Sequence, residues 1–80
     1  MPRERVKQIM AQTFGVPFAE IPDDAAIEEY PAWTSLGHLE LMMALEMEFG
    51  VSIPASTMLE LLTLDAIVDY LGSQGMSAAA

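Results

Sequence analysis

The clearest hydrophobic pattern in the chain lies in the segment TSLGHLELMMALEMEFG, residues 34–50. Its interior consists of good helix formers and contains no proline, which favours a long helix. Thr34 or Ser35 can cap the start of this helix, because either hydroxyl can accept a hydrogen bond from a free backbone N–H. Gly50 is placed to end it after Phe49, because glycine readily adopts the left-handed conformation found there.

This predicted helix carries two apolar faces at about 100° per residue. The first face, which we expect to be buried, comprises Leu41, Met42, Leu45 and Phe49. The second stripe, on roughly the opposite side, comprises Leu36, Leu39, Met43 and Met47 and is flanked by Glu40 and Glu46. We expect exposure for Leu36 and Met47, whereas burial and exposure both remain open for Leu39 and Met43.

The first part of the chain predicts one helix followed by a long loop. Residues 3–14 show the spacing of one helical face, and Gly15 follows as a stop. The apolar positions of that face are Val6, Ile9, Met10 and Thr13. Residues 15–34 contain three prolines and no periodicity, so we expect a loop held on the core by Ile21, Ile27 and Trp33.

The last third of the chain predicts a brief helix and a longer one. Ser56 is placed to cap a short helix that runs to Leu62, and Thr63 to cap a last helix that Gly72 ends. The apolar face of the last helix comprises Leu64, Ile67, Val68 and Leu71.

These elements predict an all-α fold, a small bundle of three main helices plus one short helix. An 80-residue chain supports one domain and one core. We expect the domain to cover residues 1–72 and residues 73–80 to form a flexible tail. The chain has no run of about 18 apolar residues and no apolar N-terminal stretch, so we expect neither a membrane span nor a secretory signal. It also has no cysteine, which excludes disulfides and thiolate metal sites and, with the preceding features, favours a cytoplasmic location.

Charge restricts the possible partners. The net charge is −9, and the only basic side chains are Arg3, Arg5 and Lys7. Such a surface repels nucleic acid, whose binding depends on neutralising phosphates. It attracts proteins that carry basic patches and speeds their encounter. An acidic surface also aids solubility alone, so both interpretations remain open at this point.

The stretch WTSLGHLELMMALEMEFGVSIP resembles the modification site and second helix of acyl carrier proteins. In that family an Asp-Ser-Leu triplet opens the second helix, a run like VELVMALEEEFG follows, and an Ile-Pro link comes next. Here the matching residues are Thr34, Ser35 and Leu36, then LELMMALEMEFG, then Ile53 and Pro54. The segment LTLDAIVDYL is similar to the family's fourth helix, and the resemblance spans residues 3–71.

The resemblance implies a free-standing, monomeric carrier that is not itself an enzyme. Ser35 would be esterified to phosphopantetheine taken from coenzyme A, and the thiol of that arm would hold an acyl group as a thioester. The implied partners are a phosphopantetheinyl transferase and acyl-loading and acyl-transferring enzymes with basic docking patches. They would belong to a fatty acid, polyketide or other specialised biosynthetic pathway. A helix N-terminus suits a phosphodiester, because its free N–H groups and dipole favour an anion.

The chain departs from the acyl carrier pattern at several positions. Thr34 stands where the family usually has Asp, which keeps a capping oxygen and loses a charge. Gly37 and Met47 stand at positions that are commonly acidic. Trp33 is similar to a tryptophan found in a specialised branch of the family, and we expect it to pack the loop. The mixed patch predicted to contact partners comprises Leu36, Leu39, Glu40, Met43, Glu46 and Met47.

Other polar residues predict no metal or catalytic site. His38 lies near the core side of its helix, beside the mouth of the cavity that an acyl chain would enter, and we expect it to be a partly exposed polar residue. It lacks the partners that a metal ligand or a catalytic base needs. The carboxylates of the long loop lack the spacing of a calcium loop and are expected to face solvent; they are Asp23, Asp24, Glu28 and Glu29.

Two alternatives to an acyl carrier remain. The first is an unmodified acidic interaction module that has kept the fold. The second is a carrier of an aminoacyl group, although peptidyl carriers typically have a run such as Gly-Gly-His before the serine. The sequence Ala32-Trp33-Thr34 stands there in this chain and favours the acyl type.

Overall fold

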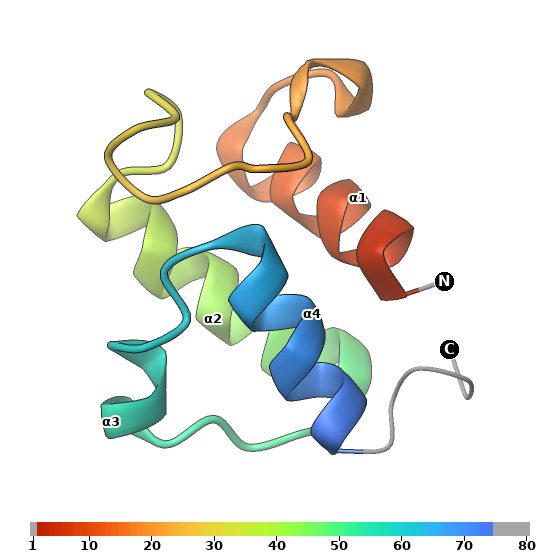
Figure 1. The fold of residues 1–80 in the computed structure, drawn as a ribbon, viewed down its shortest axis with the longest axis vertical. Helices are drawn as coiled ribbons and strands as arrows, with labels where there is room; N and C mark the ends of the chain where they lie inside the picture. The colour runs from red at the N-terminus through yellow and green to blue at the C-terminus, as the bar shows by residue number, and fades with distance from the viewer. Residues whose placement is uncertain (1, 75–80) are drawn as a thin grey trace.

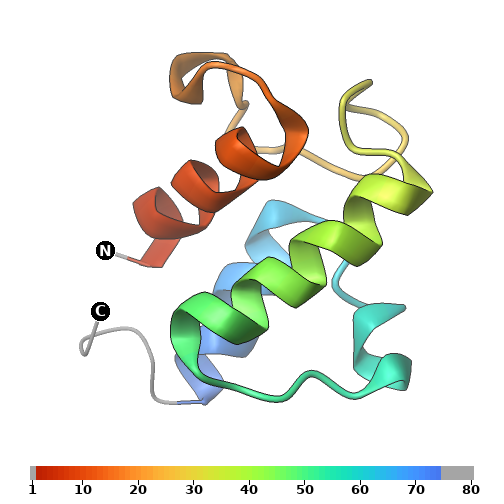
Figure 2. The same ribbon diagram turned by 180° about the vertical axis from the view of Figure 1, so that it is seen from behind.

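The computed structural model describes residues 2–74. Its elements, in chain order, are α1 (Pro2–Phe14), the short 3-10 helix η1 (Phe18–Glu20), α2 (Ser35–Phe49), α3 (Ala55–Met58) and α4 (Leu64–Ser73). Three longer helices, one short α-helix and no strand over residues 2–74 confirm the predicted all-α bundle. Helix α1 packs against both α2 and α4, and α3 lies at the far side of the bundle from α1 (Figures 1 and 2). Residues 75–80, most of the predicted tail, lie outside the described residues.

The core forms where the apolar faces of α1, α2 and α4 meet. From α2 it takes Leu41, Met42 and Leu45, all fully buried, while Phe49 is partly buried against the same cluster. This confirms the face predicted from the helical period. The fully buried partners from the other two helices are Val6, Met10, Leu64, Ile67 and Leu71, joined by the almost fully buried Ile9. Within residues 2–74, no helix combines the length and the apolar character needed to cross a bilayer.

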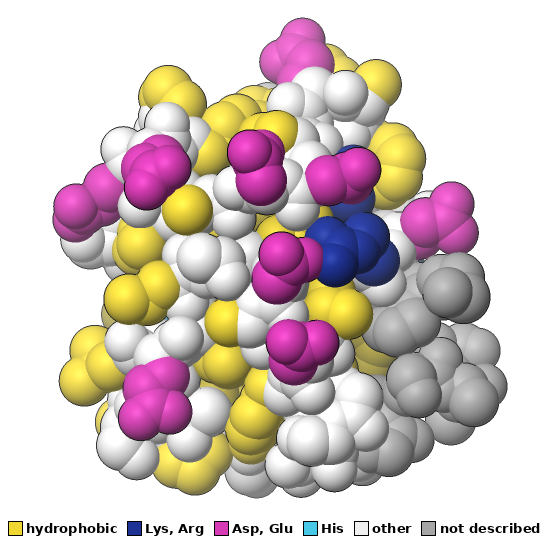
Figure 3. Space-filling view, in the orientation of Figure 1, with side chains coloured by type: hydrophobic (Ala, Val, Ile, Leu, Met, Phe, Trp, Pro, Cys, Tyr) yellow, Lys and Arg dark blue, Asp and Glu magenta, His cyan; other side chains and the backbone are white. Residues whose placement is uncertain are grey.

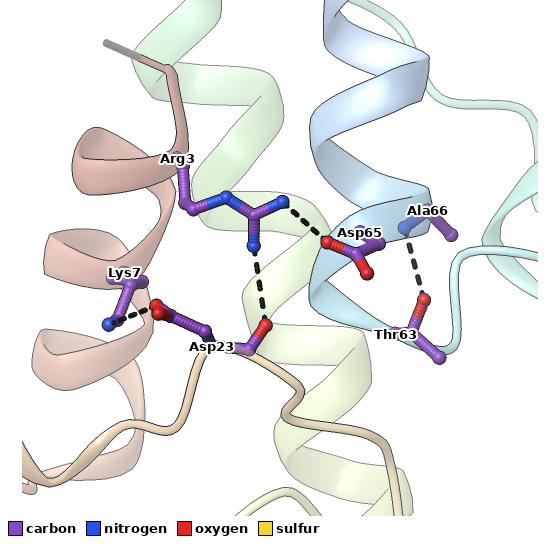
Figure 4. Close-up of polar contacts among 6 residues, drawn as sticks. All are labelled: Arg3, Lys7, Asp23, Thr63, Asp65 and Ala66. Atoms are coloured by element: carbon purple, nitrogen blue, oxygen red, sulfur yellow. Dashed lines mark hydrogen bonds and ion pairs between the residues drawn. The ribbon is translucent and has the colours of Figure 1, made fainter.

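Side-chain caps and one glycine fix the ends of the longer helices. The Thr34 hydroxyl accepts a hydrogen bond from Gly37 N–H at 3.0 Å, so Thr34 and not Ser35 caps α2. Gly50 ends α2 in the left-handed conformation, at φ 65°. Thr63 caps α4 by accepting from Ala66 N–H at 3.0 Å, as predicted (Figure 4).

Two predicted helix ends were wrong. Helix α3 ends at Met58 rather than Leu62, and its N-cap position is Pro54, so Ser56 lies inside the helix and does not cap it. Helix α3 has no side-chain cap and no buried residue. Helix propensity alone does not stabilise a helix this short, so it does not continue to Leu62. Helix α4 continues one residue past Gly72, to Ser73, because that glycine is not in the left-handed conformation that ends helices.

The long loop between α1 and α2 is held on the bundle along its length. Ile21 and Trp33 are buried and Ile27 is partly buried, as predicted. The backbone also forms an antiparallel bridge between Ala26 and Thr63. In this bridge Ile27 N–H donates to Leu62 O and Leu64 N–H donates to Ala25 O, each at 3.0 Å. The bridge connects the loop to the residues that open α4.

All three basic side chains of α1 pair with carboxylates of other elements. Arg3 donates to the Asp23 carbonyl at 3.3 Å and to the Asp65 carboxylate, which raises the pKa of Arg3 above its ordinary value (Figure 4). Lys7 donates to the Asp23 carboxylate at 2.9 Å and holds the pKa of Asp23 below its ordinary value. Arg5 pairs with Glu48 of α2. In Figure 3 the cations lie directly against carboxylates, so the remaining acidic charge dominates the surface of that face.

Candidate functional site

Ser35 is the first residue of α2, and its side chain is exposed. Because Thr34 takes the capping role, Ser35 is not needed as a cap. The first backbone N–H groups of a helix have no carbonyl of the preceding turn to donate to, which gives this end positive character. The first turn of α2 contains no acidic residue. An anionic group attached to Ser35 Oγ would therefore meet no repulsion from the first turn of α2.

A partly open cavity of about 300 Å³ lies between α2 and α3, and Ser35 is one of the residues that line it. Its walls are almost wholly apolar. From α2 it is lined by His38, Leu39 and Met42, and from α3 and the following residue by Ala55, Met58 and Leu59. The arrangement offers an apolar group attached near Ser35 a place away from water.

His38 is buried, at 8% exposure, so the expectation of a partly exposed residue was wrong. The indole N–H of Trp33 donates to His38 Nδ1 at 3.0 Å, and His38 Nε2 lies 2.8 Å from the carbonyl oxygen of Met58. Its ring nitrogens are thus both paired within the fold. Residues 2–74 contain no group of three His, Cys, Asp or Glu side chains placed to hold a metal ion. His38 therefore acts in packing and hydrogen bonding.

The outer stripe of α2 is exposed along its whole length. Leu36 and Met47 are 67% and 83% exposed, which confirms the prediction for both. Leu39 and Met43, for which the sequence left both outcomes open, are 51% and 56% exposed. Helix α2 therefore presents four large apolar side chains to solvent, next to the exposed Glu40.

Glu46 differs from Glu40 in its surroundings. It is partly buried, and its Oε2 accepts a hydrogen bond from Ile53 N–H at 2.7 Å. This bond connects the C-terminal half of α2 to the link that precedes α3. Glu46 therefore has a structural role as well as its place in the predicted patch.

Gly37 is buried, and a packing contact accounts for the glycine. A Cβ at this position would lie 3.3 Å from Phe14 Cε1 and 3.3 Å from Thr34 Oγ1. Phe14 reaches this point from the end of α1, and its ring centroid lies 6.1 Å from that of Trp33. Because Gly37 has no side chain, the Phe14 ring can pack against the first turn of α2.

The sequence pattern did not identify Phe14 or Met58 as neighbours of the site. For His38 a signal was present, because it stands three, four and seven residues before the buried positions of α2. Those positions are Leu41, Met42 and Leu45. The same spacing therefore places His38 on the buried face.

Residues 4–71 match the family model described as the phosphopantetheine attachment site. The match covers most of the chain and includes α2 with Ser35 at its start. Domains of this family are non-catalytic carriers to which phosphopantetheine is covalently attached. The chain therefore belongs to the phosphopantetheine-binding family of acyl-carrier-like proteins.

Proposed function

We propose that Ser35 is the attachment residue and that the chain carries an acyl group as a thioester on the resulting arm. One observation supports this proposal above all. Ser35 is exposed at the start of α2, and it is not the capping residue, because Thr34 caps the helix. It also lines an apolar cavity. These are the properties that a modified serine and its cargo need.

The modification is a transfer from coenzyme A. Ser35 Oγ bonds to the phosphorus that bears the pantetheine, and the pyrophosphate bond of coenzyme A breaks. Adenosine 3′,5′-bisphosphate leaves, and the proton of the hydroxyl passes to a base of the transferase. The chain contains no cysteine, so the thiol that later holds the acyl group comes from the attached arm.

The cavity favours an aliphatic cargo over an aminoacyl one. Its walls contain no carboxylate, and the one nitrogen-bearing side chain, His38, has both ring nitrogens paired elsewhere. An ammonium group placed there would lose its hydration with no partner in return. A hydrocarbon chain would gain from leaving water.

The exposed stripe of α2 is the surface that we propose for partner enzymes. It comprises Leu36, Leu39, Met43 and Met47, with Glu40 and Glu46 beside it. Methionine side chains adapt to different apolar surfaces, and the carboxylates favour a basic rim on the partner. One carboxylate oxygen of Glu46 accepts a hydrogen bond from Ile53 N–H. The carboxylate of Glu40 is exposed and is therefore more available to a basic partner.

Loading followed by intact-mass measurement tests the proposal. After incubation with coenzyme A and a broad-specificity transferase, the protein should gain the mass of one phosphopantetheine, and Ser35→Ala should gain none. Failure of the native chain to gain mass, while an ordinary carrier in the same mixture does, would favour an unmodified interaction module. Comparing octanoyl-loaded with aminoacyl-loaded protein by thermal unfolding then tests the cargo, with the octanoyl form expected to be more stable.

A further inference from the structure

Helix α3, which walls the cavity, is weakly held by its own sequence. It has four residues, Ala55–Met58, with no side-chain cap at its start and no buried residue within it. An isolated helix of this length is not stable in water. Its position over the cavity must therefore depend on contacts made by other elements.

His38 makes such a contact. The indole N–H of Trp33 is a donor only, so His38 Nδ1 must accept and the ring proton must lie on Nε2. Nε2–H then donates to Met58 O, at 2.8 Å, at the end of α3. Among the hydrogen bonds of residues 2–74, this is the only one that joins α3 to α2.

The other end of this connection is firmly anchored. Trp33 is fully buried, and its ring packs near Phe14, which itself packs near Tyr30. Trp33 is also two residues before Ser35. The chain of contacts therefore runs from the packed loop beside Ser35, through His38, to the exposed wall of the cavity.

We propose that His38 is a positioning residue that latches α3 over the cavity beside Ser35. With the Nε2–H bond to Met58 O in place, α3 stays beside α2 and its apolar side chains flank one side of the partly open cavity. When that one bond breaks, α3 moves away and the contents are released. As a statement about cargo, this inference rests on the proposed function of Ser35; the latch itself is a property of the unmodified chain.

Two amide substitutions separate the two halves of the His38 contact. In His38→Asn the amide oxygen lies close to the position of Nδ1 and can accept from Trp33, but the side chain is too short to reach Met58 O. In His38→Gln the amide nitrogen lies close to the position of Nε2 and can donate to Met58 O, but the acceptor for Trp33 is lost. Each variant loses one of the two hydrogen bonds of His38, and only His38→Asn loses the one that ties α3 to α2.

Amide hydrogen exchange on the unmodified protein tests the latch directly. The reporters are Met58 N–H and Leu59 N–H, which donate to Pro54 O and Ala55 O and so span α3. In His38→Asn they should exchange about tenfold faster than in His38→Gln, the effect expected for loss of one hydrogen bond. The α4 amide of Ile67 should exchange alike in the two variants. Equal exchange at Met58 and Leu59 in both variants would overturn the latch.

A measurement on the native chain covers the case in which a variant fails to fold. Nitrogen NMR of His38 should report the tautomer with the proton on Nε2, hydrogen-bonded to a carbonyl. A proton on Nδ1 instead would overturn the latch, because Nε2 would then have nothing to donate to Met58 O.

The loaded protein connects the latch to cargo. Octanoyl loading should raise the unfolding midpoint above that of the acetyl-loaded form by at least about 4 °C in native protein and in His38→Gln. This difference should be lost in His38→Asn, and its survival there would contradict the role of the latch in holding cargo. If the chain accepts no phosphopantetheine, the proposed function is contradicted. The latch is not, because the exchange experiment measures it on the unmodified protein.

Discussion

The indole N–H of Trp33 donates a hydrogen bond to His38 Nδ1 over 3.0 Å, with both side chains buried. This bond joins the end of the long loop to the first turn of α2, and Thr34 and Ser35 lie between the two residues. The path of the backbone through Ser35 is therefore fixed from both sides. The exposure of its hydroxyl is a consequence of packing as well as of its place at the helix start.

Removing the indole donor should destabilise the whole domain. Trp33→Phe leaves His38 Nδ1 buried without a partner and leaves a gap in the core. We expect the free energy of unfolding to fall by about 2–4 kcal/mol, measured by urea denaturation. In a double-mutant cycle with His38→Leu, the combined loss should be smaller than the sum of the two single losses by about 0.5–3 kcal/mol. Strict additivity would show that the bond contributes nothing.

Gly37 and Met47, two of the three positions that lack the family's usual acidic residue, should respond differently to the introduction of a carboxylate. Gly37→Glu would force its Cβ against Phe14 and Thr34, each 3.3 Å away, and should lower the free energy of unfolding by about 1–3 kcal/mol. Met47→Glu, at an 83% exposed position, should change it by no more than about 0.5 kcal/mol. Thermal or denaturant unfolding measures both. Similar values for the two would contradict the packing explanation of Gly37.

Alanine substitutions of Glu46 and Glu40 provide a second comparison between a partly buried and an exposed position. Glu46→Ala removes the acceptor of Ile53 N–H and should destabilise the domain by about 1–3 kcal/mol. Glu40→Ala, at an exposed position, should be neutral within about 0.5 kcal/mol. For partner association the more informative variant is therefore Glu40→Lys, which should slow binding to a basic partner most at low salt. An association rate unchanged by Glu40→Lys would argue against the proposed surface.

Acid should weaken the attachment of α1 to the loop. Lys7 lowers the pKa of Asp23 in the folded state below its ordinary value of 3.8. Since the folded pKa is the lower one, the pair stabilises the fold at pH values above 3.8 and loses this effect as the pH falls through the folded pKa. Asp23→Asn should therefore lose less stability than native protein between about pH 5 and pH 2. The effect should be small, because the Asp23 side chain is 79% exposed.

Asp24→Asn is the matched control for that titration. Asp24 is the exposed neighbour of Asp23, and it forms no ion pair within residues 2–74. Identical acid unfolding curves for Asp23→Asn and native protein would show that the Lys7 pair does not contribute.

Local signals in the sequence were enough to predict the framework of the site. The period of α2 identified its buried face, Gly50 its end, and Thr63 the start of α4. These features depend on residues a few positions apart, where helical geometry fixes what can meet. The exposure of Ser35 at the helix start follows from the same local rules once Thr34 takes the cap.

The contacts that finish the site could not be predicted in this way. Phe14 meets Gly37 from 23 positions earlier in the chain, and the carbonyl of Met58 meets His38 from 20 positions later. Neither pair has a spacing that any helix or turn would impose. They depend on how α1 and α3 pack against α2. The acceptor at Met58 is a backbone carbonyl, which every residue has, so the sequence cannot mark it. The end of α3 was wrong for the same reason, since tertiary contacts decide where so short a helix stops.

The most direct test of the account is the site of modification itself. Native protein and Ser56→Ala, which retains Ser35, are each incubated with coenzyme A and a broad-specificity transferase, proteolysed and analysed by tandem mass spectrometry. The account predicts one phosphopantetheine on the peptide that contains Ser35 in both, and none on Ser35→Ala. A phosphopantetheine on any other residue, or its persistence in Ser35→Ala, would contradict the account.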